Sequence, residues 1–236
     1  MPLEHRKNRK QQSHLLLGAS TAAAAAMVNV AGVMVFFAYT SNITGHVATL
    51  AQEIVKGHWY QTAIVFIWLM MFFGGSFVAQ LLISRFEKTG SSTSHALPII
   101  LEILVLLYIG FYGHFYYHES LKETEVLIAS LLFCMGLQNS MVAILSGNQV
   151  KTTHLTGLIT DLGREVSLWL FEKHQTPKLM VKLKLHVTIL LFYLMGGIFG
   201  GYLFLYYEFQ VFYLVAIILI SVLYFHLTRR RRNQAG

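Results

Sequence analysis

Polar residues follow the same pattern at two places in this 236-residue chain. Residues 40–54 read TSNITGHVATLAQEI, and residues 152–166 read TTHLTGLITDLGREV. Each stretch follows an apolar segment and is more polar than the sequence around it. The identical positions are Thr40/Thr152, Thr44/Thr156, Gly45/Gly157, Leu50/Leu162 and Glu53/Glu165. We interpret the pattern as an internal repeat and name its copies the first and second Thr-Gly motifs.

Hydroxyl and amide side chains are concentrated at the beginning of each motif. Such groups coordinate a small ion or hydrogen-bond a polar solute, and the free N–H groups where a helix starts favour anions. A polar, Gly-containing interruption at corresponding positions of two halves points to a binding or conduction site in a membrane protein. Alternatively, the threonines are N-caps that satisfy only backbone donors. The candidate residues are Thr40, Ser41, Asn42, Thr44 and Gly45 in the first motif and Thr152, Thr153, His154, Thr156 and Gly157 in the second.

Three further amide side chains interrupt apolar runs. Asn29 lies 15 residues before Thr44, and Asn139, which follows Gln138, lies 17 residues before Thr156. An amide at membrane depth faces protein or water rather than lipid. These amides either join the site of the motifs or make interhelical hydrogen bonds worth less than about 1–2 kcal/mol.

Charged residues offer an ion pair or a proton relay. Asp161, Arg164 and Glu165 share one face of a helix, where Asp161 and Arg164 can pair. Glu53 is the counterpart of Glu165, and Glu102 lies inside an apolar run. A membrane-embedded carboxylate is a functional candidate, whereas a charged pair at the inner surface contributes little, and Glu102 could also reach the interface.

No catalytic arrangement is present. The sequence lacks a Ser/His/Asp set, an H-E-x-x-H motif and a phosphate-binding loop, so we expect no enzyme, no cofactor and no metal site.

The composition places the chain in a bilayer. It is 55% hydrophobic and only 12% charged, whereas globular domains carry about 25% charged residues. The net charge of +7 is concentrated in HRKNRK at residues 5–10 and RRRR at 229–232. Such clusters favour the cytoplasmic face, and without interleaved aromatic residues they do not indicate nucleic-acid binding. The expected partners are the lipid bilayer, a small polar solute or ion, and further copies of the chain.

Six apolar runs are long enough to cross a bilayer, which requires about 20 residues. Since backbone polar groups in lipid must be satisfied within the segment, all are predicted helices. The fold class is therefore all-α, with about six transmembrane helices plus two polar membrane-associated helices at about 42–56 and 154–171. The runs cover about 15–39, 59–83, 97–117, 124–146, 185–206 and 209–228.

The motifs divide the chain into two related halves. We expect a basic cytoplasmic N-terminus at 1–14, repeat halves at 15–117 and 118–228, and a basic cytoplasmic C-terminus at 229–236. With three spans per half, the halves are inverted relative to each other, and the two motifs enter the membrane from opposite faces.

Basic residues in the loops favour six spans with both ends inside a bacterial inner membrane, because the outer loops then hold only Lys56 and Lys122. An eight-span alternative would place Arg85 and Lys88 outside and Asp161, Arg164 and Glu165 within a span.

The repeat extends to paired glycines. Gly74-Gly75 in GGSFVAQLL is echoed by Gly196-Gly197 in GGIFGGYLF. Small residues let helices approach closely, so these positions predict helix contacts.

Four of these features together resemble a known family. They are Asn29, Thr44-Gly45, the GLQN sequence at 136–139 and TTHLTG at 152–157. The chain resembles, from about residue 18 to 228, the YoaK-like family of bacterial multi-pass inner-membrane proteins, which carries a domain of unknown function. The family usually has an acidic residue where this chain has Asn29, and its Thr-Gly-Asn is Thr-Gly-His here. The resemblance implies a helical inner-membrane protein and supplies no substrate.

The sequence thus favours a secondary transporter or channel for a small polar solute or ion, with its site formed by the two Thr-Gly motifs. The alternative is a non-transporting membrane scaffold or envelope-physiology protein, in which the motifs are packing devices.

Overall fold

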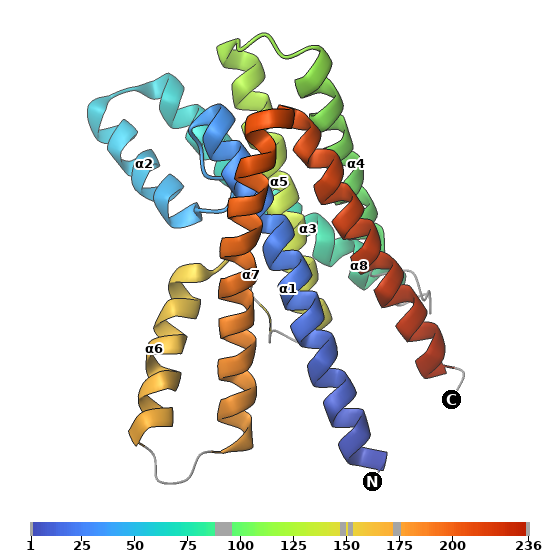
Figure 1. Cartoon of the computed structure of the whole chain (residues 1–236). Coiled ribbons are helices and arrows are strands. Elements are labelled where there is room, and N and C mark those ends of the chain that lie inside the picture. The colour runs from blue at the N-terminus through green and yellow to red at the C-terminus, as the bar shows by residue number, and fades with distance from the viewer. Residues whose placement is uncertain (1, 88–95, 147–149, 151–152, 172–175, 235–236) are drawn as a thin grey trace.

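The computed structural model describes residues 2–87, 96–146, 150, 153–171 and 176–234. Within these ranges the chain is all-helical (Figure 1), which confirms the predicted fold class at that level. The helices are α1 (Pro2–Phe36), α2 (Ile43–Lys56), α3 (Trp59–Glu87), α4 (Ala96–Phe115), α5 (Leu121–Ser146), α6 (Leu155–Phe171), α7 (Pro177–Tyr207), the 3-10 turn η1 (Glu208–Gln210) and α8 (Val211–Gln234).

Five segments of the described chain are long and apolar enough to cross a membrane. The last has 49 residues and contains α7, η1 and the part of α8 up to Phe225. α7 and α8 run in opposite directions in Figure 1. The segments are His14–Phe36, Trp59–Phe86, Ala96–Phe115, Leu121–Ser146 and Pro177–Phe225. The two predicted polar segments form α2 and α6, neither of which is among these spans.

Two helices begin well before their apolar runs. α1 starts at Pro2 and α7 at Pro177, where the apolar runs were expected to start near residues 15 and 185. The preceding turns contain lysine and arginine, which are good helix formers and extend a helix beyond the apolar part. In α7, the Thr176 side chain also caps the helix by accepting a hydrogen bond from the backbone N–H of Leu179.

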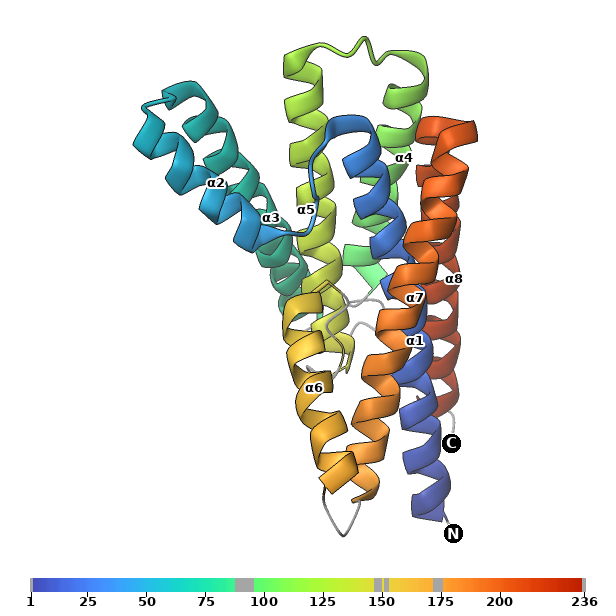
Figure 2. The ribbon, with the colours of Figure 1, turned by 60° about the vertical axis from the view of Figure 1, so that its left-hand side comes forward.

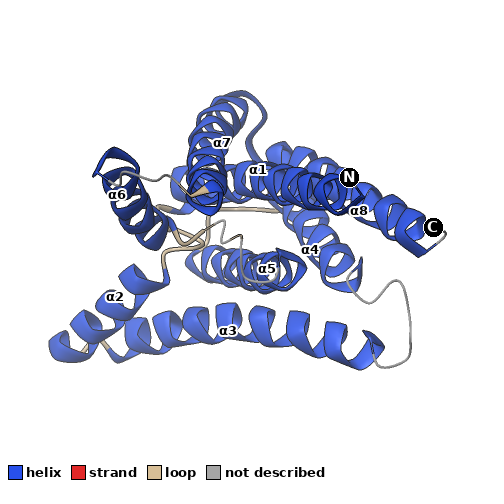
Figure 3. Ribbon diagram, turned by 90° about the horizontal axis from the view of Figure 1, so that it is seen from below, coloured by secondary structure: helices blue, strands red, loops and turns tan. Residues whose placement is uncertain are grey.

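The helices pack in corresponding pairs. α1 packs on α7 and α8, α5 packs on α3 and α4, and α1 and α5 contact each other at the centre. Figure 3 shows α5 between α3 and the group formed by α1, α7 and α8. The two polar helices lie outside this bundle, α2 on α3 and α6 on α7, and they extend toward opposite ends of the molecule (Figures 1 and 2).

Glycines set the two closest helix contacts. A Cβ atom at Gly75 would overlap the backbone of Phe133 in α5, and one at Gly196 would meet the backbone of Ala23 in α1. Gly74, by contrast, faces open space. Of the two glycine pairs, the second glycine of the first pair, Gly75, and the first glycine of the second pair, Gly196, therefore lie against the backbone of a neighbouring helix.

Aromatic rings pack around η1, which joins α7 to α8 at the end of the molecule opposite the two termini (Figure 1). The ring of Phe209 in η1 lies 5.3 Å from that of Tyr117 and 6.3 Å from those of Phe204 and Phe212. Phe36, at the end of α1, lies 5.8 Å from Tyr117. We call these five residues the ring cluster.

Candidate functional site

The beginnings of α2 and α6 lie near mid-height in the molecule. From there α2 runs toward one end and α6 toward the other (Figures 1 and 2). The first residues of each helix belong to a Thr-Gly motif. Because the free N–H groups of a helix are at its N-terminus, both helices direct donors toward the middle of the molecule.

Asn29 organises the chain that leads into α2. Its Oδ1 accepts hydrogen bonds from the backbone N–H and the hydroxyl of Thr40, at 2.8 and 3.2 Å, and from the Ser41 hydroxyl at 3.3 Å. Its Nδ2 donates to the Tyr193 hydroxyl of α7 at 3.2 Å. Asn29 and Thr40 are buried. These contacts hold residues 40 and 41 against α1 and α7. The hydroxyls of both candidate residues are therefore already hydrogen-bonded within the protein.

The N-cap of α2 is Asn42, whose side chain accepts a hydrogen bond from the backbone N–H of Gly45 at 3.0 Å. His46 is fixed by its Nε2, 2.7 Å from the Tyr39 carbonyl oxygen. Thr44 is exposed, and its hydroxyl makes no hydrogen bond within the described residues. Capping therefore accounts for Asn42 and leaves Thr44 available.

The second motif repeats part of this arrangement. The Thr153 hydroxyl donates to Asn139 Oδ1 at 2.6 Å, as Ser41 does to Asn29. Thr156 is exposed, and its hydroxyl, like that of Thr44, makes no hydrogen bond within the described part of the chain. The candidate residue Thr152 lies outside the described residues.

Two polar side chains of the core have no partner among the described residues. Both carboxyl oxygens of Glu102 in α4 and both amide atoms of Gln138 in α5 are buried without a hydrogen bond, as is Asn139 Nδ2. Glu102 and Gln138 are each fully buried, at 0% exposure. Glu102 thus stays inside the bundle and does not reach the surface.

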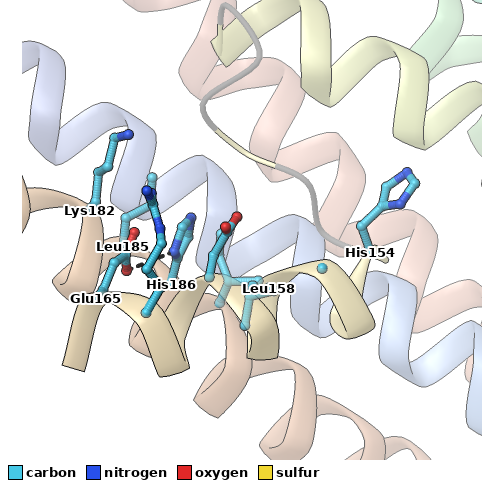
Figure 4. A pocket seen from close by; sticks show the side chains of 10 residues that line it. His154, Leu158, Glu165, Lys182, Leu185 and His186 are labelled. Atoms are coloured by element: carbon cyan, nitrogen blue, oxygen red, sulfur yellow. Dashed lines mark hydrogen bonds and ion pairs between the residues drawn. The ribbon is translucent and has the colours of Figure 1, made fainter. Parts of the chain in front are cut away.

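A polar pocket of about 240 Å³ opens between α6 and α7 (Figure 4). It brings together candidate residues from two groups: His154 and Gly157 of the second motif, and Asp161, Arg164 and Glu165 of the charged face. Sequence reasoning missed two of the charged or ionisable residues that line it, Lys182 and His186 of α7.

Glu165 is the buried ionisable group of this pocket. Its Oε2 lies 3.0 Å from Nδ1 of His186, and its side chain is only 2% exposed. Asp161 and Arg164 are exposed and line the same pocket, but the described residues include no ion pair between them. The pair that the structure does contain links α6 to α7.

Glu53, the counterpart of Glu165, also pairs with a histidine. Its Oε2 lies 2.7 Å from Nδ1 of His58, and Lys56 lies 3.7 Å from its other oxygen. The hydrogen bond with His58 holds the pKa of the Glu53 carboxyl below its ordinary value of 4.5. This pair is at the far end of α2 from the motif start, so it fixes the α2–α3 corner.

The missed residues left little signal in the sequence. Lys182 and His186 are four residues apart and therefore share a face of α7, a spacing that could have matched them to the charged face of α6. Tyr193 lies in a continuous apolar run, and no local pattern joins it to Asn29. Within the described residues, no three His, Cys, Asp or Glu side chains gather to hold a metal ion.

Comparison with known proteins agrees with the expected resemblance. Residues 17–225 match the model of a family described as "Protein of unknown function (DUF1275)". The chain is 23% identical over 160 residues to the UPF0700 transmembrane protein YoaK of Bacillus subtilis (strain 168), covering 68% of this chain and 70% of that protein. No solved structure matches. Since the family model spans most of its length, this multi-pass membrane protein belongs to the DUF1275 family.

Proposed function

We propose that the protein is a secondary transporter or channel for a small polar solute or ion, and not an enzyme. The solute site is formed by the starts of α2 and α6, with Asn29, Gln138 and Asn139 beside them. The chain crosses a bacterial inner membrane six times with both termini in the cytoplasm. Its halves, 15–117 and 118–228, form an inverted repeat.

Helix packing supports the repeat. A two-fold repeat would exchange α1 with α5, α2 with α6, α3 with α7 and α4 with α8. Under this exchange the α1–α7 contact becomes the α5–α3 contact, and the α1–α8 contact becomes the α5–α4 contact. All four of these contacts are present. The contacts of α2 with α3 and of α6 with α7 are exchanged in the same way. The pairs α1–α5 and α4–α8 map onto themselves, as expected for elements on a two-fold axis.

The motif contacts support the same relationship. Ser41 and Thr153 occupy the same position in the two motifs, and each donates a hydrogen bond to an asparagine of the preceding helix. An equivalent contact in both halves therefore holds the chain just before α2 and just before α6, the two half-helices of the proposed site. The starts of α2 and α6 are therefore fixed to the central helices α1 and α5.

The observation that carries the proposal is the state of Thr44 and Thr156. Both are exposed at the N-terminal ends of half-helices that start at mid-height, and neither hydroxyl is used by the protein within the described residues. Broken helices that begin near the middle of a membrane form the binding sites of many transporters. The polar pocket between α6 and α7 is lined in part by the second motif. From there α6 runs toward the end of the molecule that holds the termini (Figure 1).

The test is flux through proteoliposomes containing the full chain. Urea, glycerol, acetate and formate are followed by light scattering, and K⁺ and Na⁺ with ion-sensitive dyes. We expect at least one probe to cross faster than through empty liposomes. Thr44→Val and Thr156→Val should each slow it by about tenfold, since a lost hydrogen bond in the rate-limiting state costs about 1.4 kcal/mol.

Matched controls exist on the same two helices. The hydroxyls of Thr49 and Thr160 are bonded to their own helix backbone, at Gly45 and Thr156, so Thr49→Val and Thr160→Val should leave the flux unchanged. Equal loss in test and control variants would refute the site. Absence of flux for every probe would favour the scaffold alternative.

A further inference from the structure

Glu102 and Gln138 are buried polar groups that the fold itself does not use. Each is fully buried, and their four side-chain polar atoms have no hydrogen-bond partner among the described residues. Buried polar groups in folded proteins are nearly always bonded. Two such groups on adjacent helices therefore call for a binding role.

The two side chains lie on the facing sides of α4 and α5. Cys134 Sγ of α5 is 4.0 Å from the backbone carbonyl oxygen of Glu102. Gln138 is one helical turn beyond Cys134 on the same face of α5. The helices are antiparallel (Figure 1), and helical side chains lean toward the N-terminus of their helix. The Glu102 carboxyl therefore leans toward the level of Gln138.

Among the side chains that the structure describes, none forms a hydrogen bond or an ion pair with the Glu102 carboxyl. The thiol of Cys134 is the titratable group beside it. On α8, Tyr213 packs on Gly110, about two helical turns along α4 from Glu102. Arg85 and Glu87 are at the end of α3, where Arg85 is exposed, and Glu208 belongs to η1. An ionised Glu102 would thus lack both water and a counter-charge, which strongly disfavours the charged form.

A protonated carboxyl and a primary amide are complementary, because each carries a donor group and a carbonyl acceptor on the same carbon atom. In such a pair the Glu102 O–H donates to Gln138 Oε1 while Gln138 Nε2 donates to the Glu102 carbonyl oxygen. A bare carboxylate could use only the amide N–H. We propose that Glu102 and Gln138 form a proton-binding site between α4 and α5, and that the proton is the coupling ion of transport. The coupling role rests on the proposed function, whereas proton binding does not.

Infrared spectroscopy of the purified full chain in lipid-free detergent tests proton binding directly. At neutral pH the wild type should show the C=O stretch of one protonated carboxylic acid. Glu102→Gln should abolish this band, and Gln138→Leu should shift it because a hydrogen bond is lost. The control Glu119→Gln, at an exposed carboxyl, should not change it. Absence of the band, or its persistence in Glu102→Gln, would overturn the site.

Proteoliposome flux tests coupling. For a probe that the wild type carries, an inward proton gradient should raise initial uptake several-fold, and Glu102→Gln should abolish that dependence while Glu119→Gln retains it. A wild-type flux that ignores the gradient overturns coupling alone. If no probe crosses, transport and coupling both fail, and the infrared band still decides whether Glu102 holds a proton.

Discussion

Asn29 accepts three hydrogen bonds through Oδ1 and donates through Nδ2 to Tyr193. Asn139 makes the corresponding bond to its own motif, from Thr153, but its Nδ2 has no partner among the described residues. Tyr193 lies three residues before Gly196, and Phe72 lies three residues before Gly75, the matching glycine. Under the proposed repeat, Phe72 is the counterpart of Tyr193 and lacks its hydroxyl.

This difference predicts opposite effects of two single-atom changes. Tyr193→Phe should lower the free energy of unfolding by about 0.5–1.5 kcal/mol, because Asn29 loses a partner, and Phe72→Tyr should raise it by a similar amount by giving Asn139 one. Thermal unfolding in detergent measures both.

The matched control is Phe73→Tyr, at a side chain 62% exposed, which should have little effect. Equal responses to Phe72→Tyr and Phe73→Tyr would contradict the correspondence of Phe72 with Tyr193.

At this scale the sequence identified residues better than their partners. The repeated pattern located the motif residues, because identical types at identical spacing are visible in one dimension. It did not pair Asn29 with Tyr193 or Glu165 with His186. The Asn29–Tyr193 contact joins helices that are far apart in the chain. His186 follows Glu165 by 21 residues on the next helix, but the motif pattern does not include it.

The elements themselves were largely predictable. Apolar runs separated by polar turns specify spans directly, since lipid tolerates little else, and the two polar segments were located within a residue or two. Which face of each helix meets its neighbour was not predictable, because an apolar helix has no polar face to mark its exposed side. The echo of paired glycines pointed to the contact but was one residue out of register.

Gly74 and Gly75 give this packing a sharp test. Gly75→Ala should destabilise the protein by about 1–3 kcal/mol, because the new methyl group overlaps the Phe133 backbone. Gly74→Ala faces open space and should be neutral or stabilise by up to about 1 kcal/mol through helix propensity. Denaturant unfolding in mixed micelles compares them. A larger loss for Gly74→Ala would show that the faces of α3 are misassigned.

For the molecule as a whole, the sequence is compatible with two membrane topologies, one with six spans and one with eight. Six spans place the end of α3 in the cytoplasm, and eight place it outside. A reporter enzyme fused after Glu87 should therefore show cytoplasmic activity, with a fusion after Lys56 as the external counterpart. A periplasmic signal at Glu87 would reverse the assignment and, with it, the opposite entry of the two motifs. In the structure α2 and α6 both start near mid-height (Figures 1 and 2), as the six-span prediction of oppositely entering motifs requires.

The ring cluster is where a tilt of α7 would pivot. It joins α1, α7, η1, α8 and the segment after α4 at one end, while the chain termini lie at the other (Figure 1). α7 has 31 residues and is about 46 Å long, at about 1.5 Å per residue, so it would act as the arm of such a tilt. A rotation of about 5° about the rings would carry its far end about 4 Å, within the usual range of small domain movements. The pocket lies between α6 and this arm, so a tilt of α7 relative to α6 would change its width.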